Sequence, residues 1–186
     1  MRVKDFSNIR IGYAFRERLA NVLDGNVMVI QPKNITPEGL AFEKDEPIHT
    51  NVPRSKVLQS GDVLVVNRGR FAAEVFALPG LWVVPSSIFI LSVNDELVLP
   101  GYVALYFNST KGQNMFRRHL EQTTVPFISV RNLGVMDIPI PPVDKQHALI
   151  NFERTAKKYG RLSKRKQELQ REILNYELTQ DGTALG

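Results

Sequence analysis

The sequence contains no cysteine in its 186 residues. This absence excludes disulfide bonds, thiolate zinc sites and cysteine nucleophiles. No apolar run approaches the roughly 20 residues that span a bilayer. The N-terminal stretch is interrupted by charged residues, so it lacks the continuous apolar segment of a signal peptide. Together these absences predict a cytoplasmic protein with no membrane association.

The common sequence signatures of catalysis are also missing. There is no G-x-x-x-x-G-K-[ST] phosphate loop, no G-x-G-x-x-G after a strand and no G-x-S-x-G elbow. The three histidines, His49, His119 and His147, lie far apart without H-x-x-x-H spacing, which disfavours a metal site. We therefore predict a binding protein rather than an enzyme, with neither a metal nor a cofactor of its own.

The positive charge is unevenly distributed along the chain. Residues 1–143 carry 15 Lys and Arg against 13 Asp and Glu, a balance of +2, whereas residues 144–177 carry 9 against 5, a balance of +4. Asp181 brings the total to the formal net charge of +5. A basic C-terminal segment suits an acidic partner such as nucleic acid. A solvated helix with a chance excess of lysine explains the same numbers.

Residues 144–177 have the pattern of one long helix. Apolar or long-stemmed residues recur in alternating steps of three and four, which is the spacing of a coiled-coil seam. At about 1.5 Å per residue the helix would be roughly 50 Å long, so its seam calls for a partner helix. The predicted dimer or partner interface consists of Phe152, Tyr159, Leu162, Lys166, Leu169, Ile173 and Tyr176.

The proline pair Pro141-Pro142 marks the boundary before this helix, with Asp144 as the expected N-cap. Upstream, short β-branched runs alternate with turn residues. A buried strand is expected at 63–66, two short helices after Leu99-Pro100-Gly101, a further strand at 125–130 and a turn at 131–134. The predicted fold is α/β of the α+β type. It comprises a mixed-sheet globular domain at 1–142, one coiled-coil-forming helix at 143–178 and a flexible tail at 179–186.

Several polar residues are suited to contacting DNA, because Arg pairs with guanine, Asn or Gln with adenine, and any cation with phosphate. The turn that follows the predicted strand 63–66 is the first choice for base contacts. A second group lies on the turn-rich loop at 33–40 and in the junction between the two short helices. The predicted DNA-binding residues are Asn67, Arg68 and Arg70, then Lys33, Asn34, Lys111, Gln113, Asn114, Arg117 and Arg118, with Arg54 and Lys56 on phosphate.

Four motifs, in this order, have the spacing of a known family. They are Gly61-Asp62-Val63-Leu64 with Gly69, the stretch from Leu99 to Ser109, Ile128-Ser129-Val130 with Leu133, and Ile138-Pro139-Ile140-Pro141-Pro142 with Gln146. The chain resembles the DNA-specificity (S) subunit of type I restriction–modification systems, in a half-length form with one target-recognition domain and one conserved helix. Lys145 departs from the family pattern, which usually has Glu there, and Gln122-Thr123-Thr124 replaces a glycine-containing turn.

The resemblance implies a non-catalytic reader of double-stranded DNA that holds methyltransferase (M) subunits and, where the system has one, a restriction (R) subunit. S-adenosylmethionine would then belong to the M subunits, which methylate adenine. The chain itself has no N/D-P-P-Y/F methylase motif, since Ile140 precedes Pro141-Pro142.

The seam predicts a homodimer through antiparallel pairing of the 144–177 helices. Such a dimer would read a bipartite, palindromic DNA site. The basic outer face of the helix could meet either DNA or an M subunit. It comprises Lys157, Lys158, Arg161, Lys164 and Arg165. The main alternative is a coiled-coil structural adaptor whose globular domain binds protein. A nuclease fused to its own specificity module is disfavoured, because no carboxylate–carboxylate–lysine cluster is evident.

Overall fold

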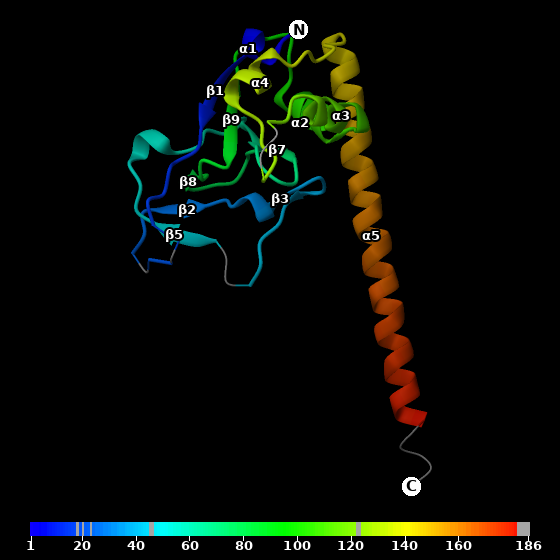
Figure 1. The fold of residues 1–186 in the computed structure, drawn as a ribbon. Coiled ribbons are helices and arrows are strands. Elements are labelled where there is room, and N and C mark those ends of the chain that lie inside the picture. Colours follow the sequence, from blue (N-terminus) through cyan, green and yellow to red (C-terminus); the bar gives the residue numbers. More distant parts are fainter. Residues whose placement is uncertain (18, 20, 23, 45–46, 122–123, 182–186) are drawn as a thin grey trace. The chain divides into compact units, whose positions relative to one another are not determined.

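The computed structural model describes residues 1–17, 19, 21–22, 24–44, 47–121 and 124–181. The chain forms two compact units, Met1–His147 and Ala148–Gly186 (Figure 1). The long helix α5, Val143–Asp181, begins in the first unit and makes up the described part of the second. This mixed α+β fold with one long C-terminal helix agrees with the predicted fold class. Each helix in the described ranges is too short or too polar to cross a membrane.

A four-stranded antiparallel sheet lies at the centre of the first unit. Its order is β1-β9-β6-β7, formed by Ser7–Ile11, Ile88–Val93, Val63–Val66 and Ala73–Val75. All four residues of β6 are buried, as the continuous β-branched run predicted. The short helix α1, Val3–Phe6, precedes β1 and buries Val3 and Phe6.

A smaller mixed sheet and a hairpin complete the β structure. The sheet has the order β5-β2-β8, formed by Ile48–Thr50, Val27–Val29 and Trp82–Val83, with β2 and β8 parallel. The hairpin pairs β3, Ile35–Thr36, with β4, Gly39–Leu40. Leu64 and Ile90 from the first sheet share one buried cluster with Trp82 from the second, so a common apolar core joins the two sheets.

Three α-helices and two 3-10 turns cover this framework. They are α2, Pro100–Asn108; α3, Thr110–Arg118; α4, Val130–Val135; η1, Pro32–Asn34; and η2, Arg54–Lys56. The Asn108 side chain at the end of α2 accepts from Ala73 N at 2.9 Å and donates to Ala73 O at 2.7 Å. This amide therefore satisfies backbone groups at the outer edge of β7, where no further strand is paired in the described chain.

The Gly61-Asp62 pair is structural. Gly61 has φ +94°, a conformation that glycine adopts without strain. The carboxylate of Asp62 is buried and accepts from Gln59 N at 2.9 Å, Ser92 Oγ at 2.6 Å and Arg10 Nη2 at 2.9 Å. Asp62 thus ties the start of β6 to β1 and β9 and fixes the strand that leads to the candidate site.

Gln146 fixes the start of α5 within the first unit. Its fully buried side chain accepts from Leu99 N at 2.9 Å and donates to Leu97 O at 2.7 Å and Pro141 O at 2.8 Å. The expectation that Asp144 caps the helix is wrong. Pro142 O accepts from Lys145 N and Gln146 N, and α5 already begins at Val143.

Two further local predictions are wrong. The expected strand at 125–130 and turn at 131–134 are an irregular segment with one isolated bridge residue, Phe127, followed by α4. Pro126 lacks a backbone donor for a sheet, and Ser129 caps α4 by accepting from Asn132 N at 3.2 Å. The expected exposed loop at 33–40 is instead η1 and the β3–β4 hairpin, with Ile35 buried in the core.

Candidate functional site

The turn after β6 is held by backbone hydrogen bonds on two sides. Asn67 N donates to Ser87 O at 3.0 Å, and Ile128 N donates to Asn67 O at 2.9 Å. Gly69 N donates to Pro126 O at 3.3 Å, and its φ of +76° explains why glycine stands at this point of the turn. The turn therefore keeps a fixed position between the segments around residues 87 and 127.

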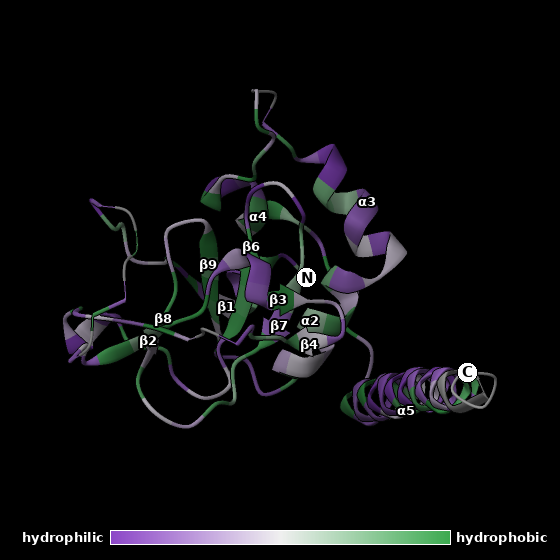
Figure 2. Ribbon diagram, turned by 90° about the horizontal axis from the view of Figure 1, so that it is seen from below, coloured by the Kyte–Doolittle hydropathy of each residue, from purple (hydrophilic) through white to green (hydrophobic). Residues whose placement is uncertain are grey.

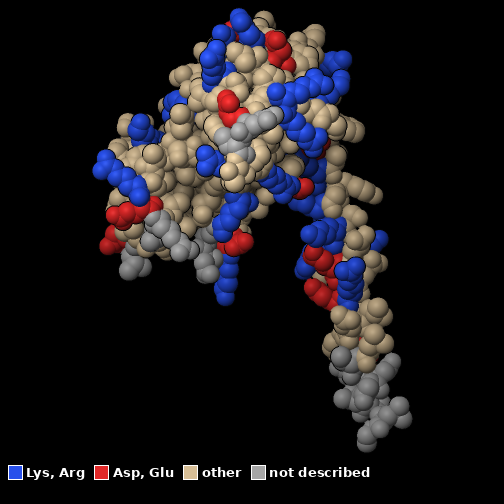
Figure 3. Space-filling model, in the orientation of Figure 1, with Lys and Arg blue, Asp and Glu red and all other residues tan. Residues whose placement is uncertain are grey.

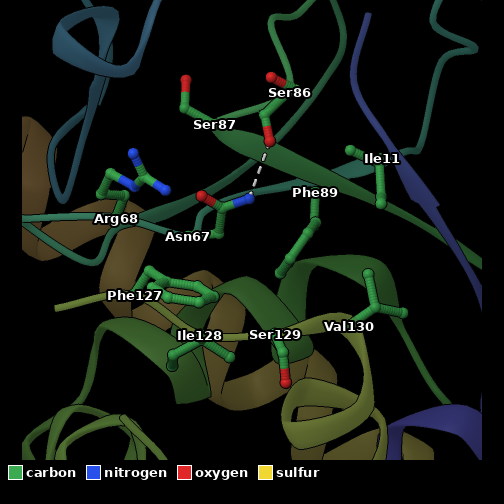
Figure 4. Close-up of a pocket in the computed structure, with 10 residues that line it drawn as sticks. All are labelled: Ile11, Asn67, Arg68, Ser86, Ser87, Phe89, Phe127, Ile128, Ser129 and Val130. Atoms are coloured by element: carbon green, nitrogen blue, oxygen red, sulfur yellow. Dashed lines mark hydrogen bonds between the residues drawn. The ribbon is translucent and has the colours of Figure 1, made fainter. Parts of the chain in front are cut away.

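A half-open hollow of about 370 Å³ lies between these segments (Figure 4). Asn67, Ser86 and Ser87 lie on one side of it, with Phe127, Ile128, Ser129 and Val130 opposite. Ile11 and Phe89 contribute apolar groups from the two strands β1 and β9. The hollow thus combines apolar walls with a few polar groups, the composition typical of a recognition site.

Arg68 lies at this hollow with its side chain exposed. Its guanidinium carbon is 5.5 Å from the centroid of the Phe127 ring. Contact between a guanidinium plane and an aromatic face restricts the side chain while leaving its donors available. The sequence offered no signal for Phe127, because it is 59 positions away and meets Arg68 only through the fold.

Helix α3 presents four of the predicted contact residues on one exposed face: Lys111, Asn114, Arg117 and Arg118. Their spacing of three, three and one places them on the same side of a helix. Arg117 Nη1 donates to Asn114 Oδ1 at 2.9 Å. The opposite face is packed on α2, and a Cβ at Gly112 would lie 2.1 Å from Tyr106 O, so only glycine permits this approach.

The structure brings the β6 turn and α3 together. Gln113 Nε2 donates to Phe71 O at 3.3 Å and to Phe107 O at 2.8 Å. The rings of Phe71 and Phe116 stack with centroids 5.2 Å apart. Lys and Arg side chains gather over the region of α2 and α3 in the space-filling view (Figure 3). We call the surface formed by the exposed cations Arg68, Arg70, Lys111, Arg117 and Arg118, together with the neutral Asn114, the cationic face.

The remaining predicted contacts lie on other elements. Asn34 is only 2% exposed, and its side chain accepts from Gln31 N and donates to Ala41 O, both at 2.8 Å. Lys33 is exposed and forms an ion pair with Glu43 at 3.4 Å. Arg54 and Lys56 are exposed on η2. Just after η2, Leu58 N donates to the backbone oxygen of Trp82, a residue of the smaller sheet.

Tyr102 on α2 and Asp5 on α1 have shifted pKa values. Burial raises the pKa of Tyr102, with a smaller contribution from Tyr106, and its hydroxyl donates to Pro139 O at 2.7 Å. A hydrogen bond from Arg2 lowers the pKa of the exposed Asp5 carboxylate. In the described part of the chain, no group of three or more His, Asp and Glu residues could hold a metal ion.

The second unit exposes large apolar side chains along α5. Phe152 and Tyr159 are 74% and 77% exposed, and Leu162, Leu169, Ile173 and Tyr176 are exposed as well. Hydrophobic residues are spaced among hydrophilic ones along this helix in Figure 2. Leu174 and Leu178 add exposed apolar surface that the predicted seam did not include.

No family model and no curated protein matches the sequence. Three solved structures nevertheless share its fold. A chain from a structure on complex assembly and conformational transition of the type I restriction–modification system has a TM-score of 0.69 and 17% identity, covering 94% of this chain and 42% of its own. The HsdS subunit of Thermoanaerobacter tengcongensis has a TM-score of 0.64 and 16% identity, covering 90% and 39%.

The S subunit of the type I restriction–modification system from M. genitalium has a TM-score of 0.54 and 14% identity, covering 82% of this chain and 37% of its own. The molecule is thus a mixed α+β domain followed by a long helix. That fold is the one found in S subunits of type I restriction–modification systems, as the motifs predicted. The chain spans about 40% of the length of these structures.

Proposed function

We propose that the chain is a non-catalytic DNA-specificity subunit of a type I restriction–modification complex. The observation that carries this proposal is the cationic face, which joins a fixed strand-end turn to an exposed helix face on an S-subunit fold. A surface of this kind suits DNA, because phosphate contacts need exposed cations and base contacts need donors held in position.

The residues divide into two kinds of contact. Asn67, Arg68 and Arg70 would contact base edges, while the exposed residues of α3 would position the protein on phosphates. Lys33, Arg54 and Lys56 would add phosphate contacts outside the cationic face. Asn34 and Gln113 are held by internal hydrogen bonds, so their contribution would be to fix η1 and α3 rather than to meet DNA.

Catalysis would reside in partner subunits. The M subunits would bind S-adenosylmethionine and methylate adenine, which requires the target base to leave the duplex. An R subunit would join where the system cleaves DNA. The basic outer face of α5 would contact either an M subunit or DNA between the two halves of the site.

The exposed apolar face of α5 supports a homodimer. Two copies would bury Phe152, Leu162 and Leu169 by antiparallel pairing of their helices. Isologous pairing places two identical readers in one particle, which fits a bipartite, palindromic DNA site. Lys166 in the seam would set the helix register at some cost in stability.

Deleting the gene in the source organism and mapping methylated adenines across the genome tests this function. One bipartite motif should lose its methylation, and the intact gene should restore it. An unchanged methylation map would refute the proposal. The purified chain should also bind DNA with an affinity that falls steeply with salt, because phosphate contacts release counterions. Salt-insensitive or absent DNA binding would favour the structural adaptor instead.

A further inference from the structure

Asn67 has almost no conformational freedom at the base of the candidate site. It is 8% exposed, and its backbone N–H and C=O are both engaged, with Ser87 O and Ile128 N. Its side-chain amide nitrogen donates to Ser86 O at 3.0 Å (Figure 4). A carbonyl oxygen can only accept, so this contact fixes which end of the amide is Nδ2.

The opposite end of the amide, Oδ1, is left as an open acceptor. Within the described residues no protein group donates to it, and no fully buried side-chain oxygen or nitrogen there lacks a partner. Oδ1 therefore faces the hollow that Asn67 lines, on the side of Arg68 (Figure 4). Ser86 O takes one of the two hydrogens of Nδ2, and the amide held in this way presents Oδ1 to the hollow as its acceptor.

Arg68 supplies the hydrogen-bond donors next to this acceptor. The guanidinium group has only donors, arranged in a rigid fork, and here it lies over the Phe127 ring. The two adjacent residues thus present two parallel donors followed by one acceptor. This donor–donor–acceptor order is a specific hydrogen-bonding pattern.

That order matches one kind of base pair in the major groove. A G·C pair presents guanine N7 and O6 as acceptors and then the cytosine N4 amino group as a donor. An A·T pair presents acceptor, donor, acceptor, which an asparagine reads with both ends of its amide. Asn67 is less suited to this reading, because Ser86 O already takes one of the two N–H groups of Nδ2 and holds the amide in place. A G·C pair therefore fits Arg68 and Asn67 together better than an A·T pair does.

We propose that Arg68 and Asn67 together read one G·C base pair of the DNA site. Arg68 donates to guanine N7 and O6, Asn67 Oδ1 accepts from the N4 amino group of the paired cytosine, and Phe127 is a positioning residue for Arg68. This assignment rests on the proposed DNA-reading function and adds the identity of the base pair to it.

Base analogues test the assignment on the unaltered protein. The full chain, with the methyltransferase subunits that copurify with it, is titrated with DNA of its own motif. At one G·C position, 7-deazaguanine and N4-methylcytosine should each weaken binding by about 5- to 100-fold, since each removes one major-groove hydrogen bond. Inosine should bind as guanine does, because it differs only in the minor groove. A motif in which no G·C position behaves in this way overturns the assignment.

Variants then assign the residues. Arg68→Ala should abolish the sensitivity to 7-deazaguanine, and Asn67→Ala should abolish the sensitivity to N4-methylcytosine. The control Arg117→Ala should weaken binding equally at all sequences. Phe127→Leu should reduce discrimination between G·C and A·T at this position without changing the salt dependence, and Phe127→Tyr should restore it. Sensitivity to both analogues that persists in the Arg68 and Asn67 variants overturns the residue assignment.

The outcomes separate this inference from the function on which it rests. A methylation map that does not depend on the gene, together with no sequence-selective DNA binding, refutes the proposed function. A gene-dependent motif without the paired analogue effect refutes only the reading of G·C by Arg68 and Asn67.

Discussion

The two compact units of this chain differ in whether they bury their apolar side chains. The core residues Leu64, Phe107 and Ile138 of the first unit are essentially inaccessible to solvent. In the second unit, Phe152, Leu162 and Ile173 are all more than half exposed. The first unit therefore encloses its own core, whereas the helix beyond residue 147 offers an apolar face without enclosing it.

This difference can be measured with separate probes. Trp82 is the only tryptophan in the sequence, and it is buried in the core of the first unit. Its fluorescence therefore reports unfolding of that unit alone. Self-association measured by sedimentation reports on the helix face. A change in one unit should leave the probe of the other almost unaffected if the comparison is sound.

The largest effect is expected on self-association. Replacing Leu162 and Leu169 together by lysine should weaken the dimer by more than about 100-fold, because each buried leucine contributes roughly 1.5–3 kcal/mol. Leucine and lysine have similar helix propensities, so the change acts on the seam. Sedimentation across protein concentrations measures the effect. The Trp82 unfolding midpoint should not move.

A matched control adds the same charge outside the seam, with Gln167 and Asn175 changed to lysine. These positions lie next to seam residues in sequence but point elsewhere on a helix. The control should keep the wild-type dimer. Equal weakening by both pairs of changes would mean that added charge, and not the seam, governs association. A wild-type chain that stays monomeric at all concentrations would refute the homodimer.

The next largest effect is expected at Asp62 in the first unit. Asp62→Ala removes the buried partner of Arg10 and the acceptor for Gln59 N and Ser92 Oγ. The unfolding free energy should fall by about 3 kcal/mol, as for other buried pairs that lose one partner. Urea unfolding followed by Trp82 fluorescence measures this loss. The exposed Asp24→Ala serves as the control and should change stability by less than about 0.5 kcal/mol.

The sequence predicted the elements whose signals are local. The run Val63–Val66 predicted a buried strand because four β-branched or apolar residues in succession suit no exposed surface. The 3–4 spacing predicted the long helix, and Gly69 was placed in the turn after the strand, where its positive φ angle now explains it. The order of motifs was sufficient to predict the fold.

Long-range contacts could not be predicted. The contact of Arg68 with Phe127 joins segments far apart in the chain, and so does the hydrogen bond from Gln113 Nε2 to Phe71 O. The same holds for the hydrogen bonds of Asp62 with Arg10 and Ser92. Asn34 was expected to contact DNA because it is polar and lies near prolines. Its burial between Gln31 and Ala41 became visible only when η1 and its hairpin were in place. The residue type alone does not tell whether a polar side chain contacts a ligand at the surface or is buried and hydrogen-bonded to the backbone.

Gly112 should show a moderate effect in the first unit. Gly112→Ala would place a Cβ 2.1 Å from Tyr106 O and 2.7 Å from Phe107 Cα, both backbone atoms that cannot rotate away. We expect a loss of about 1–3 kcal/mol in unfolding free energy, as for overpacked cores. The same variant should bind DNA more weakly, because α3 carries much of the cationic face. Unfolding curves identical to the wild type would contradict this tight approach of α2 and α3.

The smallest effect is expected at Gly160 in α5, where a substitution should raise stability and not lower it. A Cβ added there meets no atom within 4 Å. Alanine favours a helix over glycine by roughly 0.8–1 kcal/mol, so Gly160→Ala should stabilise α5 by about that amount. The helical circular dichroism of the dimer should melt at a higher temperature, while the Trp82 transition stays in place. The same change to alanine should thus lower stability at Gly112 and raise it at Gly160, because Gly112 lies in an enclosed core and Gly160 on an open helix. A destabilised dimer would instead show that a partner helix packs closely against residue 160.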